Sequence, residues 1–79
     1  MSTFEKIRKI VANHLGVDEA EISSESHLQD DLNSDPLSMA DLVVSLEDEF
    51  NVKISPEENG KFNTVGDIEI FIADQIGEV

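Results

Sequence analysis

The chain has 79 residues, no cysteine and a formal net charge of −13 at neutral pH. This length is typical of one domain with a single core, here residues 1–79, and the lack of cysteine excludes disulfides and thiolate zinc sites. No segment reaches the roughly 18 apolar residues of a membrane span, and the N-terminus lacks the order of a signal peptide. We therefore expect a cytoplasmic protein without membrane insertion.

The charge is unevenly distributed along the chain. Three cations and one acid give the first seventeen residues +2, which leaves −15 for the remainder. Nucleic acids and anionic membranes select for positive charge, so both are poor partners for this sequence. A basic protein surface is its natural complement, and we expect the chain itself to be a monomer.

A first helix is predicted from Ser2 to Leu15. Ser2 and Glu5 have the spacing of a capping box, and Gly16 is a stop signal. The apolar residues at helical spacing are Phe4, Ile7, Ile10, Val11 and Leu15.

Residues 17–34 show no sustained periodicity and predict a long first loop. A loop of this length in so small a domain is expected to pack on the core or to carry function. Its isolated apolar residues are Val17, Ile22, Leu28 and Leu32.

A second helix is predicted from Asp35, as N-cap, to about Phe50. Pro36 suits the first helical position because its fixed φ fits there and its missing N–H is not needed. A core stripe follows the i, i+3, i+4 pattern: Met39, Leu42, Val43, Leu46 and Phe50. Beside it runs a second apolar row, flanked by acids: Leu37, Ala40 and Val44, with Asp41, Glu47, Asp48 and Glu49.

Two further helices are predicted from their caps. Ser55, Pro56 and Glu58 open a helix that Gly60 ends after about one turn. A capping box at residues 64–67 opens the last helix, with Ile68, Phe71, Ile72 and Ile76 on its apolar face down to Gly77. The sequence therefore predicts an all-α, antiparallel four-helix bundle with three longer helices, a short third helix and a long first loop. Its predicted core contains Phe4, Ile7, Val11, Leu15, Leu42, Leu46, Phe50, Ile54, Ile68 and Ile72.

The run from Asp31 to Phe50, DLNSDPLSMADLVVSLEDEF, resembles the acyl carrier protein motif D-L-G-x-D-S-L-x-x-x-E-L-V-x-x-L-E-x-x-F without a gap. Residues 54–58 and 64–67 are similar to the family's third-helix start and its T-V-G-D cap. The likeness extends over essentially the whole chain. It implies a bundle that holds acyl thioesters on a 4′-phosphopantetheine arm and presents them to enzymes of fatty-acid or related synthesis, without being an enzyme.

The sequence departs from the family motif at the attachment position. The family's serine aligns with Pro36, which has no hydroxyl, so a phosphopantetheine arm cannot be attached to that residue. Asn33 replaces the motif's glycine, a mild change because asparagine tolerates left-handed backbone.

Three interpretations of Pro36 stay open: a relative that no longer carries acyl groups, a carrier loaded on another serine, or a normal carrier whose serine has been replaced. Ser34 and Ser38 are the nearest substitute hydroxyls. Ser38 lies roughly 200° around the helix from position 36. For both serines a solvated or capping role is the more ordinary interpretation.

The second helix is also the predicted partner-binding surface. Acids around an apolar row suit a docking helix with arginine and lysine, so basic surfaces of acyl-chain synthesis enzymes and a phosphopantetheinyl transferase are the predicted partners. The predicted contact residues are Leu37, Ala40, Asp41, Val44, Glu47 and Asp48.

A calcium-binding helical protein is the competing class. Asp31, Asn33 and Asp35 match the ligands that open an EF-hand loop, but Pro36 and Leu42 stand where glycine and a bidentate glutamate are needed. Weak divalent binding to crowded carboxylates stays open, and we name no metal ligand. His14 and His27 are distant from one another in sequence and fit no catalytic pattern, so we name no catalytic residue.

Overall fold

The computed structural model describes residues 2–77, which form four α-helices and one short 3₁₀ helix. The elements are α1 (Thr3–Leu15), η1 (Glu19–Glu21), α2 (Pro36–Phe50), α3 (Pro56–Asn59) and α4 (Val65–Gln75). The predicted all-α fold with a short third helix and a long first loop is confirmed, while η1 was not predicted. None of the helices in this range is both long and apolar enough to cross a membrane.

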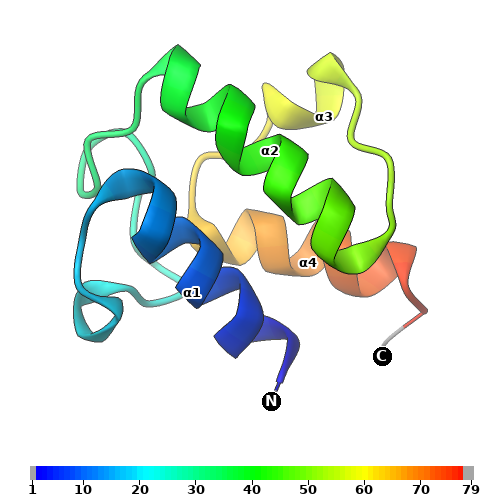
Figure 1. The fold of residues 1–79 in the computed structure, drawn as a ribbon, viewed down its shortest axis with the longest axis horizontal. Coiled ribbons are helices and arrows are strands. Elements are labelled where there is room, and N and C mark those ends of the chain that lie inside the picture. Colours follow the sequence, from blue (N-terminus) through cyan, green and yellow to red (C-terminus); the bar gives the residue numbers. More distant parts are fainter. Residues whose placement is uncertain (1, 78–79) are drawn as a thin grey trace.

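The first helix is the centre of the packing. It contacts both α2 and α4. In Figure 1, α1 rises toward the upper left while α2 descends toward the lower right, and α4 crosses the view below α2. The loop between α1 and α2 closes the left side of this arrangement.

A capping box fixes the start of α1 and a glycine fixes its end, as predicted. The Ser2 hydroxyl accepts a hydrogen bond from the backbone N–H of Glu5 at 3.1 Å, and the Glu5 carboxylate accepts one from the N–H of Ser2 at 3.1 Å. Gly16 ends the helix with a left-handed φ of 68°. These bonds satisfy backbone groups that have no partner inside the helix.

The C-terminal end of α4 differs from the prediction. The helix ends at Gln75, and Ile76 is its C-cap with 42% of its surface exposed. Gly77 follows with a φ of 78°. Ile76 therefore lies beyond the last helical residue and is not held on the buried face of α4, so its placement there was wrong.

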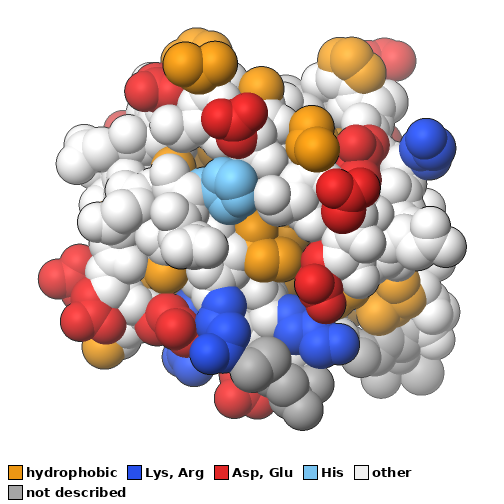
Figure 2. Space-filling view, in the orientation of Figure 1, with side chains coloured by type: hydrophobic (Ala, Val, Ile, Leu, Met, Phe, Trp, Pro, Cys, Tyr) orange, Lys and Arg blue, Asp and Glu red, His pale blue; other side chains and the backbone are white. Residues whose placement is uncertain are grey.

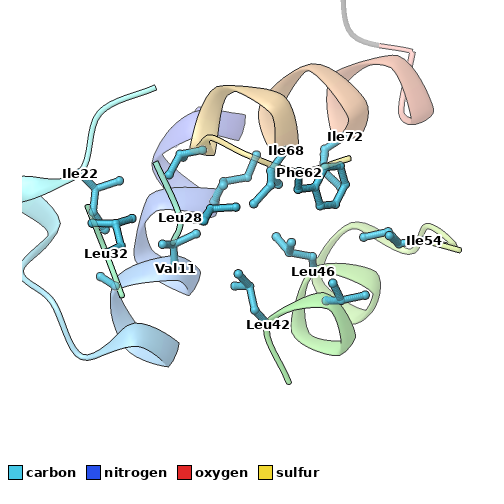
Figure 3. Packing of buried hydrophobic residues seen from close by; sticks show 14 residues of the cluster. Val11, Ile22, Leu28, Leu32, Leu42, Leu46, Ile54, Phe62, Ile68 and Ile72 are labelled. Atoms are coloured by element: carbon cyan, nitrogen blue, oxygen red, sulfur yellow. The ribbon is translucent and has the colours of Figure 1, made fainter. Parts of the chain in front are cut away.

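The core is one cluster built from α1, α2, α4, the first loop and the segments on either side of α3, while α3 itself contributes no buried residue. Figure 3 shows Ile22, Leu28 and Leu32 from the loop meeting side chains of the helices. Seven of the ten predicted core residues are buried: Ile7, Val11, Leu42, Leu46, Ile54, Ile68 and Ile72. The prediction was wrong for Phe4, Leu15 and Phe50, which are half-buried and pack against the cluster from its margin. The buried residues Phe62 and Val65 were not predicted.

The long first loop is held firmly although it contains little regular structure. Its apolar residues Ile22, Leu28 and Leu32 are buried, as predicted. Three backbone hydrogen bonds join it to the start of α4: Gly66 N–H to Ser24 O (2.8 Å), Val65 N–H to Ser26 O (3.0 Å) and Leu28 N–H to Asn63 O (2.9 Å). The loop therefore forms a fixed wall beside the point where α2 begins.

Candidate functional site at the start of α2

The first turn of α2 is capped by a carboxylate. Asp35 Oδ1 accepts the backbone N–H of Ser38 at 2.7 Å. This bond is the main reason that the pKa of Asp35 lies below its usual value, so the carboxylate is ionised at neutral pH. Pro36 is the first helical residue and has no N–H to donate. The N–H of Ser38 in the first turn therefore has its hydrogen-bond partner within the chain. The ionised Asp35 carboxylate places a negative charge at the N-terminal end of α2.

A pocket of about 490 Å³ opens at this point, between the first loop, the start of α2, the end of α3 and the residues that follow α3. Pro36 and Ser34 belong to its wall, whereas Ser38 does not. The wall residues are His27, Leu28, Gln29, Asp30, Ser34, Asp35, Pro36, Met39, Asn59, Gly60, Phe62 and Asn63.

The substitute serines differ in their surroundings. Ser34 is half-buried, and its backbone N–H donates to the carbonyl of Leu28 at 2.8 Å. Ser38 is half-buried on α2, and its backbone N–H is taken by Asp35. Asn33 has a φ of 57°, which confirms that this position uses the left-handed backbone that asparagine tolerates.

The second apolar row of α2 lies on the surface, as the sequence predicts. Leu37 is 75% exposed and Val44 is 55% exposed, and Ala40 between them is also exposed. Asp41 and Asp48 are exposed beside this row. Figure 2 shows hydrophobic and acidic side chains side by side over the upper half of the molecule, where Figure 1 has α2. Most Lys and Arg side chains in that view gather at the lower edge.

Glu47 differs from the other predicted contact residues. It is half-buried, and its Oε2 accepts the backbone N–H of Ile54 at 2.7 Å. This bond ties α2 to the segment that leads into α3. The carboxylate therefore has a structural partner within the chain, whatever contact it makes with another protein.

The acids that resembled an EF-hand loop also have partners in the backbone. Asp31 Oδ2 accepts the N–H of His27 at 2.8 Å, and Asp35 caps α2. Within residues 2–77 no three His, Cys, Asp or Glu side chains gather so that they could hold a metal ion. The alternative of a divalent-ion-binding protein therefore has no candidate site among these residues.

The side chain of His14 pairs with a serine, Ser45, of the neighbouring helix. His14 is half-buried at the end of α1, and its Nε2 lies 2.7 Å from Ser45 Oγ on α2. Neither residue lines the pocket, and no carboxylate bonds the His14 ring within the described range. A serine nucleophile needs an oriented base and a place for its substrate, so this pair is best described as a tie between α1 and α2.

Residues 5–72 match the family described as "Phosphopantetheine attachment site". The chain therefore belongs to the acyl carrier protein family.

Two solved structures are similar over nearly their whole length. A protein from Mycobacterium tuberculosis, described as a candidate acyl carrier protein, is 33% identical with a TM-score of 0.86, and the match covers 92% of this chain and 97% of that one. The acyl carrier protein of Enterococcus faecalis is 34% identical with a TM-score of 0.79, and the match covers 92% of each chain.

Position 36 does not fit the family's cofactor as a covalent attachment site. A phosphodiester needs a hydroxyl oxygen, and the pyrrolidine ring of Pro36 has none. The backbone N–H of Ser38, two residues further on, is already bonded to Asp35.

Asp35 and Met39 line the pocket at the start of α2 but were not predicted as site residues. The other pocket residues that were not predicted as site residues lie outside α2 and its cap: His27, Leu28, Gln29, Asp30, Asn59, Gly60, Phe62 and Asn63. They come from two segments that are about thirty residues apart in the sequence. Only their folding against α2 brings them together, so no spacing or motif within either segment could have revealed them.

Proposed function

We propose that this acyl carrier family member carries no phosphopantetheine arm, at position 36 or elsewhere, and serves fatty-acid or related acyl-chain biosynthesis as a protein docked by others. The observation that carries the proposal is that proline occupies the attachment position while the apolar row beside it stays exposed. The protein is not an enzyme in this account, and it acts as a cytoplasmic monomer.

The docking surface is the row formed by Leu37, Ala40 and Val44 with Asp41 and Asp48 beside it. Burial of Leu37 and Val44 under a partner removes apolar surface from water, which stabilises the complex. The two exposed acids attract a basic partner and speed its approach. Added salt is therefore expected to weaken the complex mainly by slowing association.

The loading experiment uses the wild-type chain and the Pro36→Ser variant. Each is incubated with coenzyme A and a broad-specificity phosphopantetheinyl transferase, and its intact mass is measured. The variant is expected to gain one arm because it regains a hydroxyl at the start of α2, while the wild type gains none. An arm on the wild-type chain would contradict the proposal.

The Pro36→Ser variant also makes docking measurable with a defined partner. Leu37→Ala or Asp48→Asn in that background is expected to lower kcat/KM for loading, by about fivefold or more if the residue is a hot spot. Glu57→Gln, an exposed acid on α3, is the matched control and keeps the rate. Equal rates for all these variants would argue against docking through α2.

A second candidate is a carrier loaded on Ser34, because this serine lines the same pocket as Pro36. In that case the wild-type chain would gain an arm that Ser34→Ala abolishes and Ser38→Ala does not. Peptide mapping of the adduct distinguishes this result from attachment elsewhere.

A further inference from the structure

Asn59, the last residue of α3, is followed by a glycine. The chain contains five asparagines, and only Asn59 precedes Gly60 or any other glycine. The other four precede residues with larger side chains: His14, Ser34, Val52 and Thr64. Because Gly60 has no Cβ, its backbone nitrogen can approach the side chain of Asn59 more closely than the nitrogen of a larger residue. This pair is therefore the place in the chain where a carboxamide is most open to attack by the main chain.

The reaction that this pair permits is loss of the side-chain amide. The backbone nitrogen of Gly60 forms a bond to Cγ of Asn59 and gives up its proton, while the bond from Cγ to Nδ2 breaks and Nδ2 leaves as ammonia. Water then opens the resulting five-membered imide at one of its two carbonyls. The products are aspartate, or isoaspartate when the main chain is rerouted through the side chain, and each carries one new negative charge.

The carboxamide of Asn59 gains little from its folded position. Asn59 is half-buried, and its Oδ1 is enclosed without a hydrogen-bond donor within residues 2–77. An enclosed oxygen without a donor has lost its bond to water and has gained no bond in exchange. Release of the side chain into solvent restores that bond. The fold therefore holds this carboxamide less firmly than it would hold a paired one.

The backbone of Asn59 belongs to a helix of one turn. The N–H of Gly60 donates to Pro56 O at 3.0 Å, and while this bond is made the Gly60 nitrogen is not free to attack, so the turn has to open first. The helix contributes no buried residue, and its cap is the Ser55 hydroxyl, which accepts the N–H of Glu58 at 3.1 Å. A short turn with so few contacts opens at low cost in free energy.

We propose that Asn59 is a site of spontaneous deamidation in this protein and that the opening of α3 sets its rate. Two independent observations support the site: the unhindered nitrogen of Gly60, and a carboxamide oxygen without a donor at the end of a one-turn helix. The product places a carboxylate where that oxygen was enclosed, and an unpaired enclosed charge is far more costly than an unpaired amide. We therefore expect α3 to stay open in the product, which displaces the part of the pocket wall that Asn59 and Gly60 form.

Incorporation of oxygen from water tests the site in the full chain. The protein is incubated in mildly alkaline buffer made with ¹⁸O-labelled water and is then digested with trypsin in ordinary water, so that only the first step introduces the label. Two tryptic peptides each contain a single asparagine: peptide 54–61 with Asn59, and peptide 62–79 with Asn63. The labelled acid is expected to form severalfold faster in peptide 54–61. Equal or slower labelling of this peptide would overturn the proposal.

Gly60→Ala tests the attacking group. The new Cβ would meet its nearest neighbours at 3.5 Å, so the fold accommodates it. Because the methyl group crowds the backbone nitrogen, labelling of peptide 54–61 is expected to slow about tenfold, a barrier higher by about 1.4 kcal/mol. An unchanged rate would show that the nitrogen of residue 60 is not the nucleophile and would overturn the proposal.

Ser55→Ala tests the control by α3. Labelling of peptide 54–61 is expected to rise about fivefold, the factor that corresponds to loss of a cap worth about 1 kcal/mol. Ser2→Ala removes the matched cap of α1 and is expected to leave this labelling unchanged. A rate in Ser55→Ala equal to that of the wild type would overturn the control by α3. An equal rise in both variants would overturn it as well, because labelling would then follow unfolding of the whole chain.

Discussion

The starts of α2 and α4 use the same local chemistry but have opposite surroundings. In each, an N-cap side chain accepts the backbone N–H three residues later: Asp35 from Ser38 at 2.7 Å, and Thr64 from Asp67 at 3.1 Å. At α4 the next residue, Val65, is completely buried. At α2 the residues after the cap, Pro36 and Leu37, are exposed.

The two helices begin with the same kind of cap, but their N-terminal ends have different roles. A cap satisfies the free N–H groups of the first turn in both places. At α4 the chain then packs against the first loop through Gly66 and Ser24, so this end holds the fold together. At α2 no such packing follows, and an apolar row and a pocket stay accessible to another molecule.

Of the changes at the two helix starts, the largest effect is expected at the packed start of α4. In Gly66→Ala the new Cβ would lie 2.8 Å from the carbonyl oxygen of Ser24, so the loop or the helix must shift. We expect a loss of about 1–3 kcal/mol in the free energy of unfolding, measured in urea.

Gly60→Ala is the control for that variant. Gly60 has an ordinary φ of −66°, and a Cβ there would meet its nearest neighbours at 3.5 Å. Its stability is expected to change by less than about 0.5 kcal/mol. Similar losses in the two variants would mean that the contact between Gly66 and the first loop does not hold the start of α4.

The second expected effect concerns the capping box of α4. Asp67 Oδ2 accepts the N–H groups of Asn63 and Thr64, at 2.9 and 3.0 Å, and these bonds lower the pKa of Asp67. Asp67→Ala is expected to cost about 1 kcal/mol at pH 7. Because the folded pKa lies below the unfolded one, this stabilisation is present above the unfolded value near pH 4 and is lost as pH falls through the folded pKa.

Urea unfolding of the wild type and Asp67→Ala at pH 7 and at pH 3 or below measures that effect. The difference between the two proteins is expected to narrow at acid pH. A difference that stays constant over this range would mean that the ionised carboxylate does not provide the stabilisation.

The smallest expected effect on stability is at the exposed row of α2. Leu37→Ala is expected to change the free energy of unfolding by less than about 0.5 kcal/mol, because the side chain is 75% exposed. Leu46→Ala on the buried face of the same helix is the contrast, with an expected loss of about 2–5 kcal/mol. A large loss in Leu37→Ala would show that the row serves the fold and not a partner.

Local patterns in the sequence were enough to predict most of the fold. The caps at Ser2, Asp35 and Thr64 and the stop at Gly16 lie where predicted, because each acts on its own few neighbours. The burial of Phe62 was missed because the core contacts that enclose it come from other segments. Its ring packs edge-on against the ring of Phe71, with the two ring centroids 5.6 Å apart. This contact joins α4 to the segment before it.

The candidate site was only partly predictable for the same reason. The exposed row of Leu37, Ala40 and Val44 follows from helical spacing alone, and the loss of the attachment hydroxyl follows from one residue, Pro36. The pocket could not be predicted in this way, because Asp30 and Asn59 are far apart in the sequence and line one pocket only in the folded chain.

The most direct test of the central claim is the intact mass of the protein purified from its native host, with peptide mapping of any adduct. The account predicts the unmodified mass of the chain. A mass increased by one phosphopantetheine arm, mapped to Ser34, Ser38 or another hydroxyl, would contradict it and show that the protein is a working carrier.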